Sequence, residues 1–440
     1  MKEIKNRLKI NSIIIGLIFL FVQAVMLTSC APRQKRIVVW HWMTDRQDAF
    51  AVLSNRYFNE TGIRVKFVLC APSKRYDRKI VLASKIGMLP DIYGMLGDIW
   101  EFSRFINSGY AVDLSDELNA NAGEWRNQFF KWVISENEFF PNNEQKVKPG
   151  VYGIPIDVNN IQMVYNKDLF KAAGLDPEAP PKTWEAFIAY GKKLRRAGIT
   201  PFVSGWGELW LVNCFANNYA FNLMGEEKII LTIKGQVPYN NHDWIRILKL
   251  FEEMRDAGMY AEGITTMNNK KAEMIFANSQ AAMAFNGSWC VNVYREINPN
   301  LNYGVFMPPR LSNRHPMRIW GGGGAPFVVN AKSKNKEEAI EFLKWLTAEE
   351  QQKFLVMTTH NLSVNREVTF LIPFKLSEFA DDMDSVITPE LLPVIENSKV
   401  SEAFGKGIWT IIKDNKSPSE AITYVDVIKR LVSAHRYLPD

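Results

Sequence analysis

The sequence predicts an α/β protein built from two lobes. Its 440 residues are more than one ordinary hydrophobic core supports. Between residues 37 and 95 the hydrophobic pattern alternates strand, helix, strand, helix, strand, an order that specifies a parallel sheet with right-handed crossovers. Residues 152–158 form a β-prone run in which Gly153 and Pro155 would weaken a central sheet position. We therefore interpret 152–158 as a crossover between two bodies.

The first body is predicted from the segment that precedes this crossover. Apolar spacing indicates strands over 37–40, 64–69 and 90–95 and helices over 45–60 and 76–86, each helix closed by a glycine. Ligands of parallel α/β sheets bind at the carboxyl ends of the strands. The candidate ligand-binding residues that follow the first and third strands are Trp42, Asp45 and Asp98.

The second body is predicted to begin after the crossover, and the elements that follow are taken in chain order. Strands are expected over 161–165, 281–285, 301–306 and 327–330, and helices over 166–174, 243–257 and 268–278, with another helix capped by Thr183. Four glycines, 321–324, precede the last strand. Asn335 with Glu338, and Thr347 with Glu350, are two successive N-cap signatures, so residues 336–356 are predicted to form two helices in series.

A longer pattern supports this division. Tyr-Gly-Ile-Pro at 152–155, Tyr-Asn-Lys-Asp-Leu-Phe at 165–170, Ala-Gly-Leu-Asp at 173–176 and Pro-Pro-Lys-Thr-Trp at 180–184 closely resemble the extracellular solute-binding proteins of ABC importers, especially those that bind sugars and oligosaccharides. The resemblance continues through 283–289, 303–309 and 321–330, and becomes loose after residue 362.

The resemblance implies a type II periplasmic-binding-protein-like fold, with two α/β lobes made of discontinuous segments and joined by a hinge. Lobe one would hold residues 37–154 and 306–357, and lobe two residues 155–305 and 358–440. Three crossings near residues 154, 306 and 358 would form the hinge.

The amino-terminal residues predict an extracytoplasmic location. A basic head precedes an apolar run over 13–22, which is short for a membrane span and typical of a signal peptide over residues 1–29. Leu27-Thr28-Ser29-Cys30 resembles a bacterial lipobox. It implies that Cys30 is lipidated and anchors the mature chain to the cell membrane through a tether at 30–36. The alternative is an uncleaved amino-terminal anchor, which also leaves the rest outside the cytoplasm.

The net charge and the cysteine content argue against nucleic-acid-binding and disulfide-stabilised proteins. The net charge of +6 falls by three when four basic residues and one acidic residue leave with the signal peptide, which is too mild to imply a nucleic acid partner. Besides Cys30, the chain has Cys70, Cys214 and Cys290, so at most one disulfide can form. We expect a monomer.

No catalytic or metal-binding motif stands out. The five histidines are scattered without an HExxH spacing, Gly-x-Ser-x-Gly is absent, and the glycine run 321–324 lacks the Lys-Ser/Thr of a phosphate loop. We therefore predict no cofactor, no metal and no enzyme. Carboxylate pairs for glycan cleavage cannot be read from linear sequence, which leaves a surface glycan-degrading lipoprotein as the alternative from another class.

Tryptophan usage points to carbohydrate. The chain has 13 tryptophans, and an indole face offers an apolar platform for a pyranose ring whose hydroxyls bond to Asp, Asn and backbone amides. Trp289 follows Asn-Gly-Ser, where sugar binders of the resembled family place a stacking aromatic. Trp206 lies between two glycines that leave room for a ligand. Trp42 and Trp320 are further candidates, and for all four the alternative is core packing.

Polar candidates accompany these rings. Asp98 could accept hydrogen bonds from sugar hydroxyls or cap the next helix, and Asp45 could bind a ligand or serve as an N-cap. Gly322 and Gly323 would let a backbone approach a ligand closely, or form a flexible loop.

These observations lead to one functional prediction. A lipid-anchored receptor captures a carbohydrate between two lobes by hinge closure and delivers it to the permease subunits of an ABC importer. The alternative within binding proteins is a charged small solute such as glycerol phosphate, a polyamine or ferric ion, although the adjacent tyrosines usual in the iron class are absent.

Overall fold

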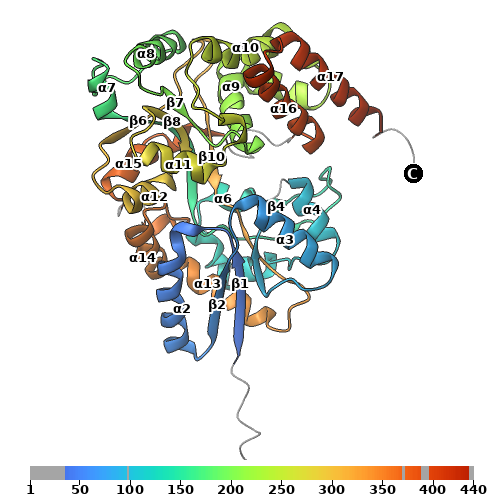
Figure 1. The fold of residues 1–440 in the computed structure, drawn as a ribbon. Coiled ribbons are helices and arrows are strands. Elements are labelled where there is room, and N and C mark those ends of the chain that lie inside the picture. The colour runs from blue at the N-terminus through green and yellow to red at the C-terminus, as the bar shows by residue number, and fades with distance from the viewer. Residues whose placement is uncertain (1–34, 97–98, 369–371, 388–395, 436–440) are drawn as a thin grey trace, which may run out of the picture.

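The chain folds into two bodies, each built on its own β-sheet (Figure 1). The structure is a computed structural model, and it describes residues 35–96, 99–368, 372–387 and 396–435. We call the body on the four-stranded sheet lobe one and the body on the six-stranded sheet lobe two. Cys30 and Asp98 lie outside the described residues.

The sheet of lobe one has the strand order β11-β3-β1-β2. Its strands are β1 (Arg36–His41), β2 (Arg64–Leu69), β3 (Ile92–Gly94) and β11 (Phe327–Val329). β1 pairs in parallel with both β2 and β3, which confirms the predicted parallel order. β11 completes the sheet in the antiparallel direction, although it lies far along the chain from β3.

The helices of lobe one cover both faces of this sheet. They are η1 (Thr44–Arg46), α2 (Gln47–Thr61), α3 (Ser73–Lys85), α4 (Ile99–Asn107), α5 (Ser115–Gly123), η2 (Arg126–Gln128), α6 (Lys131–Ser135), α13 (Lys336–Thr347) and α14 (Glu349–Thr359), with a small β4 (Glu138–Phe139) and β5 (Gly150–Val151) hairpin. Phe50 stacks on Phe67 with ring centroids 4.2 Å apart, and Phe342 of α13 packs 6.0 Å from Phe67. Helix α13, which comes late in the chain, therefore completes the core formed by the first strands and helices of lobe one.

The two helices predicted in series over 336–356 are confirmed, but their caps differ from the prediction. Asn335 makes no capping hydrogen bond, and α14 begins after Ala348. The Thr347 hydroxyl instead donates to the Leu343 carbonyl at 2.8 Å and accepts from the Trp125 indole N–H at 3.0 Å. Burial of Thr347 gives its hydroxyl better partners than a cap position would.

The sheet of lobe two is organised around one long strand. Its strands are β6 (Val158–Asn166), β7 (Phe202–Val203), β8 (Met283–Gly287), β9 (Tyr303–Phe306), β10 (Ile319–Gly323) and β12 (Val386–Ile387). β6 pairs antiparallel with β8, β9 and β10, and β7 pairs in parallel with β8. β6 begins where the predicted crossover 152–158 ends and contains the strand predicted over 161–165, so the chain enters lobe two at its centre.

Strand β10 differs from the prediction. Residues 319–323 were expected within lobe one, with Gly322 and Gly323 either approaching a ligand or forming a flexible loop. Gly321, Gly322 and Gly323 instead pair with Asn160, Asn159 and Val158 of β6. A Cβ on Gly321 would meet the Asn159 carbonyl oxygen at 2.6 Å, so the missing side chain permits this close pairing. The chain therefore returns to lobe one between β10 and β11, near residue 325, and not near residue 306.

Lobe two carries most of its helices on the outer faces of the sheet (Figure 1). They are α7 (Lys167–Ala172), α8 (Trp184–Arg196), α9 (Leu209–Ile233), α10 (His242–Asp256), η3 (Ile264–Thr266), α11 (Asn269–Ala277), α12 (Cys290–Ile297), α15 (Phe374–Ala380), η5 (Met383–Ser385), α16 (Ser398–Asp414) and α17 (Pro418–His435). The short helix η4 (Arg366–Val368) instead packs on α14 of lobe one, so the chain leaves lobe one after η4 and not near residue 358. Thr183 caps α8 through a 3.3 Å bond from the Ala186 N–H, as predicted. α9 bends at Gly225, whose φ is +73°.

Two further features concern the whole described chain. Within residues 35–435, excluding the undescribed gaps, no helix combines the length and hydropathy of a membrane span. Cys70, Cys214 and Cys290 are free thiols.

Candidate functional site

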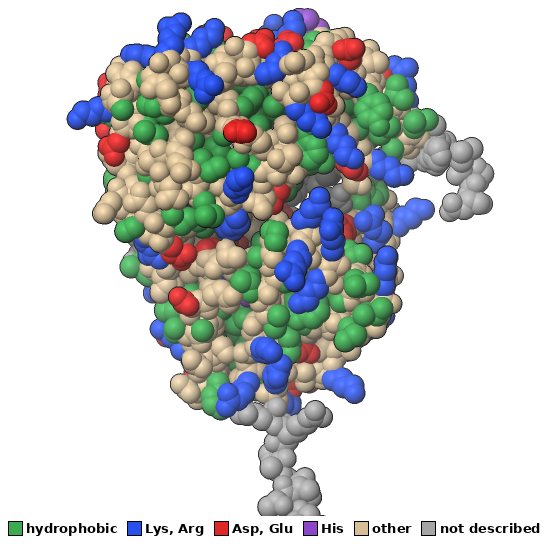
Figure 2. All heavy atoms as spheres, in the orientation of Figure 1, with side chains coloured by type: hydrophobic (Ala, Val, Ile, Leu, Met, Phe, Trp, Pro, Cys, Tyr) green, Lys and Arg blue, Asp and Glu red, His purple; other side chains and the backbone are tan. Residues whose placement is uncertain are grey.

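The facing surfaces of the two lobes form a hollow that is visible on the molecular surface (Figure 2). The contacts between the lobes come, on the lobe-one side, from η1 after β1, the first turn of α3 and Glu136 after α6. On the lobe-two side they come from the residue before α9, helix α12 and strand β10. Direct hydrogen bonds join the lobes. The Ser73 hydroxyl donates to Glu208 at 3.3 Å, and the Asn292 amide donates to the Asp45 carbonyl at 2.8 Å.

Two tryptophans form an aromatic pair on the lobe-two side. The Trp210 and Trp289 rings lie 6.1 Å apart at an interplanar angle of 53°, and Trp210 is 43% exposed. Each indole N–H donates to a carboxylate, from Trp210 to Glu208 at 3.2 Å and from Trp289 to Glu273 at 3.0 Å. Their edges are thus held by hydrogen bonds, which leaves ring faces for an apolar partner.

Glu273 anchors this wall. The carboxylate is buried and accepts hydrogen bonds from Asn269 at 2.8 Å and Asn286 at 3.3 Å, besides the bond from Trp289. Lys270 forms an ion pair with it at 3.0 Å. Burial lowers the pKa of Lys270, but the carboxylates of Glu273, Asp45 and Glu208 outweigh that effect and hold this pKa above its ordinary value. The lysine therefore stays charged beside the hollow.

A buried ion pair lies at the junction of the lobes. The guanidinium of Arg46 bonds to the carboxylate of Asp157, the residue before β6, and approaches Asp45 at 3.5 Å. Burial lowers the pKa of Arg46, and the two carboxylates raise it further than burial lowers it. Asp45 also accepts a hydrogen bond from the Asn361 amide at 3.2 Å. Asp45 therefore links both lobes and the return segment, and it does not cap α2.

Glu136 of lobe one lies against the glycines of β10. Its carboxylate accepts a 2.8 Å hydrogen bond from the Gly323 N–H. A Cβ on Gly322, whose φ is +131°, would come within 2.1 Å of that carboxylate. The glycines thus permit a close approach, as predicted, and in this structure the approaching group is a side chain of the opposite lobe. Their approach to a ligand stays a prediction.

Carboxylates also gather where α3 faces lobe two. Burial, together with the negative charges of Glu101 and Glu208, raises the pKa of Asp77 to about 7. Burial likewise raises the pKa of Glu208. The basic residues Lys74, Arg75 and Arg78 of α3 are exposed. Lys and Arg side chains lie beside the hollow in Figure 2. The described residues hold no group of His, Cys, Asp and Glu arranged to bind a metal.

The four predicted tryptophans have different surroundings. Trp289 belongs to the aromatic pair. Trp42 is partly buried in lobe one, 5.3 Å from Tyr76, with its ring over Gly94. Trp320 lines a cavity inside lobe two. Trp206 does not face any hollow.

The prediction that Trp206 contacts a ligand is wrong. Its side chain is 0% exposed and packs among Phe202, Phe215, Phe251 and Tyr260, with centroid distances of 5.0–5.7 Å. The flanking glycines serve backbone packing, because a Cβ on Gly205 would meet the Asn269 backbone at 2.5 Å and one on Gly207 would meet the Thr266 backbone at 2.6 Å. They leave no room for a ligand.

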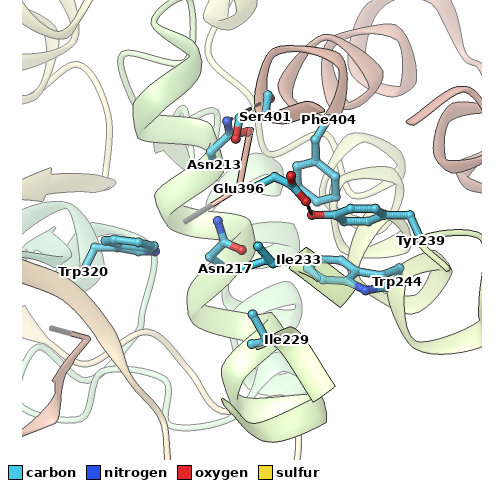
Figure 3. Close-up of a pocket in the computed structure, with 10 residues that line it drawn as sticks. All are labelled: Asn213, Asn217, Ile229, Ile233, Tyr239, Trp244, Trp320, Glu396, Ser401 and Phe404. Carbon is cyan, nitrogen blue, oxygen red and sulfur yellow. Dashed lines mark hydrogen bonds between the residues drawn. The ribbon is translucent and has the colours of Figure 1, made fainter. Parts of the chain in front are cut away.

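The cavity beside Trp320, which we call the lobe-two pocket, has a volume of about 100 Å³. This volume is below the range of roughly 300–1,000 Å³ typical of small-molecule sites. Figure 3 shows Trp320 on one side, an aromatic and acidic group on the other, and two amides of α9 between them. Its lining residues are Asn213, Asn217, Ile229, Ile233, Tyr239, Trp244, Trp320, Glu396, Ser401 and Phe404.

Several residues of these surfaces were not singled out by the sequence. Trp210 could have been found, because Trp210, Asn213 and Asn217 recur at helical spacing in an otherwise apolar segment. Glu136, Lys270 and Glu273 carry no local signal, since only the fold brings them to the hollow.

Two α/β lobes on separate sheets, with aromatic and hydrogen-bonding side chains on their facing surfaces, define a two-lobed ligand-binding protein of the type II periplasmic class. The sequence profile described as bacterial extracellular solute-binding protein matches residues 42–353, more than half of the chain. The protein therefore belongs to this family of solute-binding proteins, which act outside the cytoplasm.

Individual relatives are distant. The multiple sugar-binding protein of Streptococcus mutans is 25% identical over 288 residues, which cover 63% of this chain and 64% of that protein, slightly under two thirds of its length. The sn-glycerol-3-phosphate-binding periplasmic protein of Salmonella typhimurium is 31% identical over 225 residues, covering 48% of this chain and 50% of that protein. The structure of the solute-binding protein RafE with raffinose superimposes with a TM-score of 0.73 and 18% identity, covering 90% of this chain and 99% of RafE, and shows the shared fold.

Proposed function

We propose that this protein is the sugar-capturing component of an ABC importer and binds an oligosaccharide in the hollow between its lobes. The observation that carries the proposal is the aromatic pair Trp210–Trp289, whose edges are held by carboxylates while hydrogen-bonding groups surround it. Pyranose rings present C–H faces to aromatic platforms and hydroxyls to such groups. Family membership and the sugar-binding relative support the same assignment.

The mechanism is hinge closure. A ligand that contacts both lobes binds the closed arrangement better than the open one and so shifts the population towards closure. Bonds between the lobes, such as Ser73 to Glu208 and Gly323 to Glu136, are the contacts that such a motion would rearrange. The closed, loaded protein would then dock on the permease subunits, and no turnover of the sugar is involved.

The chain would be held at the membrane by lipid on Cys30. The amino-terminal basic and apolar segments and the Leu-Thr-Ser-Cys sequence support this. Cys30→Ser should release the protein from the membrane fraction and abolish labelling by radioactive palmitate, whereas Cys70→Ser should change neither.

A saccharide screen tests the function. A ligand that binds only the native protein raises its melting temperature. We expect at least one neutral oligosaccharide to raise the melting temperature and to shrink the radius of gyration in X-ray scattering. Absence of both effects with every saccharide tested, or release of cleaved glycan from the purified protein, would contradict the proposal.

Glycerol 3-phosphate is the second candidate ligand. The 31% identity to a glycerol-phosphate-binding protein and the charged Lys270 beside the hollow favour it. Adding glycerol 3-phosphate to the screen and repeating it at higher salt distinguishes the two, because a phosphate ligand would lose affinity as salt rises and a neutral sugar would not.

A further inference from the structure

The end of lobe one that lies opposite the hollow carries exposed apolar side chains. Helix α3 begins at Ser73, which bonds to lobe two, and ends at Lys85, so its far end lies about 20 Å from the lobe contact. At this far end Leu82, Ile86 and Met88 are 61%, 59% and 65% exposed. Large apolar side chains that are exposed close to one another indicate a surface that meets a partner.

Other segments of lobe one meet at this end. The Asp91 carboxylate, just before β3, accepts hydrogen bonds from the Ser333 hydroxyl at 2.5 Å and from the Asn335 amide at 3.1 Å. The Asn335 amide also donates to the carbonyl of Arg36, the first residue of β1, at 3.2 Å. These bonds bring three segments together at one end of lobe one. We call this end the base, and it consists of residues 35–36, 82–91 and 331–338.

The base has an excess of positive charge. It contains six basic residues and three acidic ones. Of the acidic residues, Asp91 accepts the hydrogen bonds just described and Glu338 pairs with Lys35. Lys and Arg side chains gather at the lower end of the molecule in Figure 2, where β1 begins in Figure 1. The basic residues of the base are Lys35, Arg36, Lys85, Lys332, Lys334 and Lys336.

A pocket at the edge of the base brings further cations together. Arg36, Arg64 and Lys66 line this pocket, which lies against α2 and has a volume of about 250 Å³. Arg36 and Arg64 are direct neighbours in the pairing of β1 with β2, and the Arg64 guanidinium lies 4.5 Å from the centre of the Phe58 ring. Three cations around one pocket suit an anionic group such as a lipid phosphate better than a neutral partner.

The tether places a membrane close to the base. Lys35, the first described residue, lies five residues after Cys30, and an extended chain spans at most about 3.6 Å per residue. The base can therefore lie no more than about 18 Å from a lipid-bearing Cys30. The positive base then lies within about two Debye lengths of the lipid surface at physiological salt. The length of this tether and the charge of the base both identify an anionic lipid surface as the partner.

We propose that the base of lobe one lies on an anionic lipid surface, with its basic residues paired to lipid phosphates and Ile86 and Met88 at the level of the head groups. The inference rests on the proposed lipid anchor at Cys30 and adds a second contact with the same membrane. A lipid chain and a basic patch together hold a protein at a membrane more firmly than either alone. In this orientation α3 holds the hollow about 20 Å away from the lipid.

Lysine acetylation of the membrane-bound protein tests this orientation. The protein is expressed from the full chain, purified in detergent and reconstituted into vesicles of phosphatidylcholine with or without phosphatidylglycerol. A short pulse of an amine-acetylating reagent, followed by mass spectrometry, gives a labelling rate for each lysine. The exposed Lys192 of α8 and Lys249 of α10, both in lobe two, are internal controls.

We expect phosphatidylglycerol to slow the labelling of the base lysines at least threefold and high salt to restore it, because salt screens the pairing of amines with phosphates. The two lobe-two lysines should stay within twofold. Unchanged labelling of the base, or equal slowing in both lobes, would overturn the proposal and leave the lipid anchor standing. Loss of the protein from both kinds of vesicle would overturn the anchor and this proposal together.

A pair of serine variants tests the apolar contact. Ile86→Ser with Met88→Ser should at least halve the protection of the base lysines on phosphatidylglycerol vesicles. Phe374→Ser with Tyr424→Ser, which removes two exposed rings from lobe two, is the matched control and should leave this protection unchanged. Equal protection in both pairs would overturn the placement of Ile86 and Met88 among the head groups.

A charge reversal tests the basic residues, with Lys336 as the reporter. The base variant combines Lys85→Glu, Lys332→Glu and Lys334→Glu, and it should abolish the protection of Lys336. The control variant makes the same change in net charge on lobe two through Lys192→Glu, Arg196→Glu and Lys249→Glu, and it should keep that protection. Melting temperatures check that each variant folds. Protection of Lys336 that survives in the base variant would also overturn the proposal.

Discussion

The indole N–H of Trp289 donates a 3.0 Å hydrogen bond to the buried carboxylate of Glu273. The same ring lies so closely over Gly287 that a Cβ there would meet ring atoms at 2.1 Å. One contact fixes the edge of the ring and the other fixes one face. The side chain is thus oriented before any ligand arrives, which reduces the entropy lost on binding.

Trp289→Ala should weaken binding of the cognate sugar by roughly 1–3 kcal/mol, because an aromatic contact surface disappears. Trp289→Phe, which keeps a ring but loses the bond to Glu273, should lose less. Titration calorimetry measures both affinities, and melting temperatures check that the fold survives. Equal affinity in Trp289→Ala and the native protein would remove this ring from the site.

Trp206→Ala should act on stability and not on binding. Loss of a fully buried indole among four aromatic rings should lower the free energy of unfolding by about 3–5 kcal/mol. Trp206→Phe should cost less, since its indole N–H has no partner among the described residues. Urea denaturation gives the stabilities, and a weaker sugar affinity in a folded Trp206→Phe variant would argue against a purely packing role.

Removal of only one partner of the Arg46–Asp157 ion pair should lower the free energy of unfolding strongly. Asp157→Ala leaves the buried guanidinium with only the weaker 3.5 Å contact to Asp45, so we expect a loss of about 3–5 kcal/mol in unfolding free energy. The double variant Arg46→Met with Asp157→Leu should recover much of it, because no charge is left unpaired. Glu349→Ala, at an exposed pair with Lys353, is the control and should change little.

Asp77 should make stability fall as pH rises. Its pKa is about 7 in the folded protein against an ordinary 3.8, so between these values the folded state holds a proton that the unfolded state releases. The stability contribution is therefore full below pH 4 and is lost by about pH 7. Asp77→Asn should match the native stability at pH 4 and exceed it by about 1 kcal/mol at pH 8, less than the full linkage value because the carboxyl is partly exposed. Urea titrations across this range measure the difference, and a pH-independent difference would contradict the assignment.

Gly322→Ala should disturb the contact between the lobes. An alanine there would have both an unfavourable φ near +131° and a Cβ against the Glu136 carboxylate, so we expect a loss of roughly 2–3 kcal/mol. Gly62→Ala is the matched control, since its φ of +74° is strained but its Cβ would meet open space, and about 1 kcal/mol is expected. Equal losses, compared by thermal unfolding, would show that the carboxylate moves aside without cost.

The sequence predicted most of the regular elements, and local signals explain why. Strand and helix periodicity placed β1, β2, α2 and the two helices after Asn335, and the Thr183 cap marked the start of α8. β10 was missed because a run of glycines carries no alternation, although the missing side chains are what allow it to pair with β6. Because β10 was not predicted as a strand, its residues were assigned to lobe one and not to the sheet of lobe two.

The candidate site was less predictable than the fold. Glycine neighbours suggested space around Trp206, but the space is filled by backbone of η3 and α11. Trp289 was singled out from its local sequence and does lie in the aromatic pair, whereas its partner Glu273 depends on packing between α11 and α12. Contacts such as Glu136 with Gly323 join residues far apart in the chain, and no local pattern encodes them.

The pairing of β11 with β3 also sets an order for biogenesis. Lobe one cannot finish its sheet until residues 327–329 have been synthesised, because β11 supplies the edge strand next to β3. A ribosome has then already translated about three quarters of the polypeptide. The sheet of lobe two is likewise completed late, by β12 at 386–387, so both sheets stay incomplete during most of the synthesis of the chain.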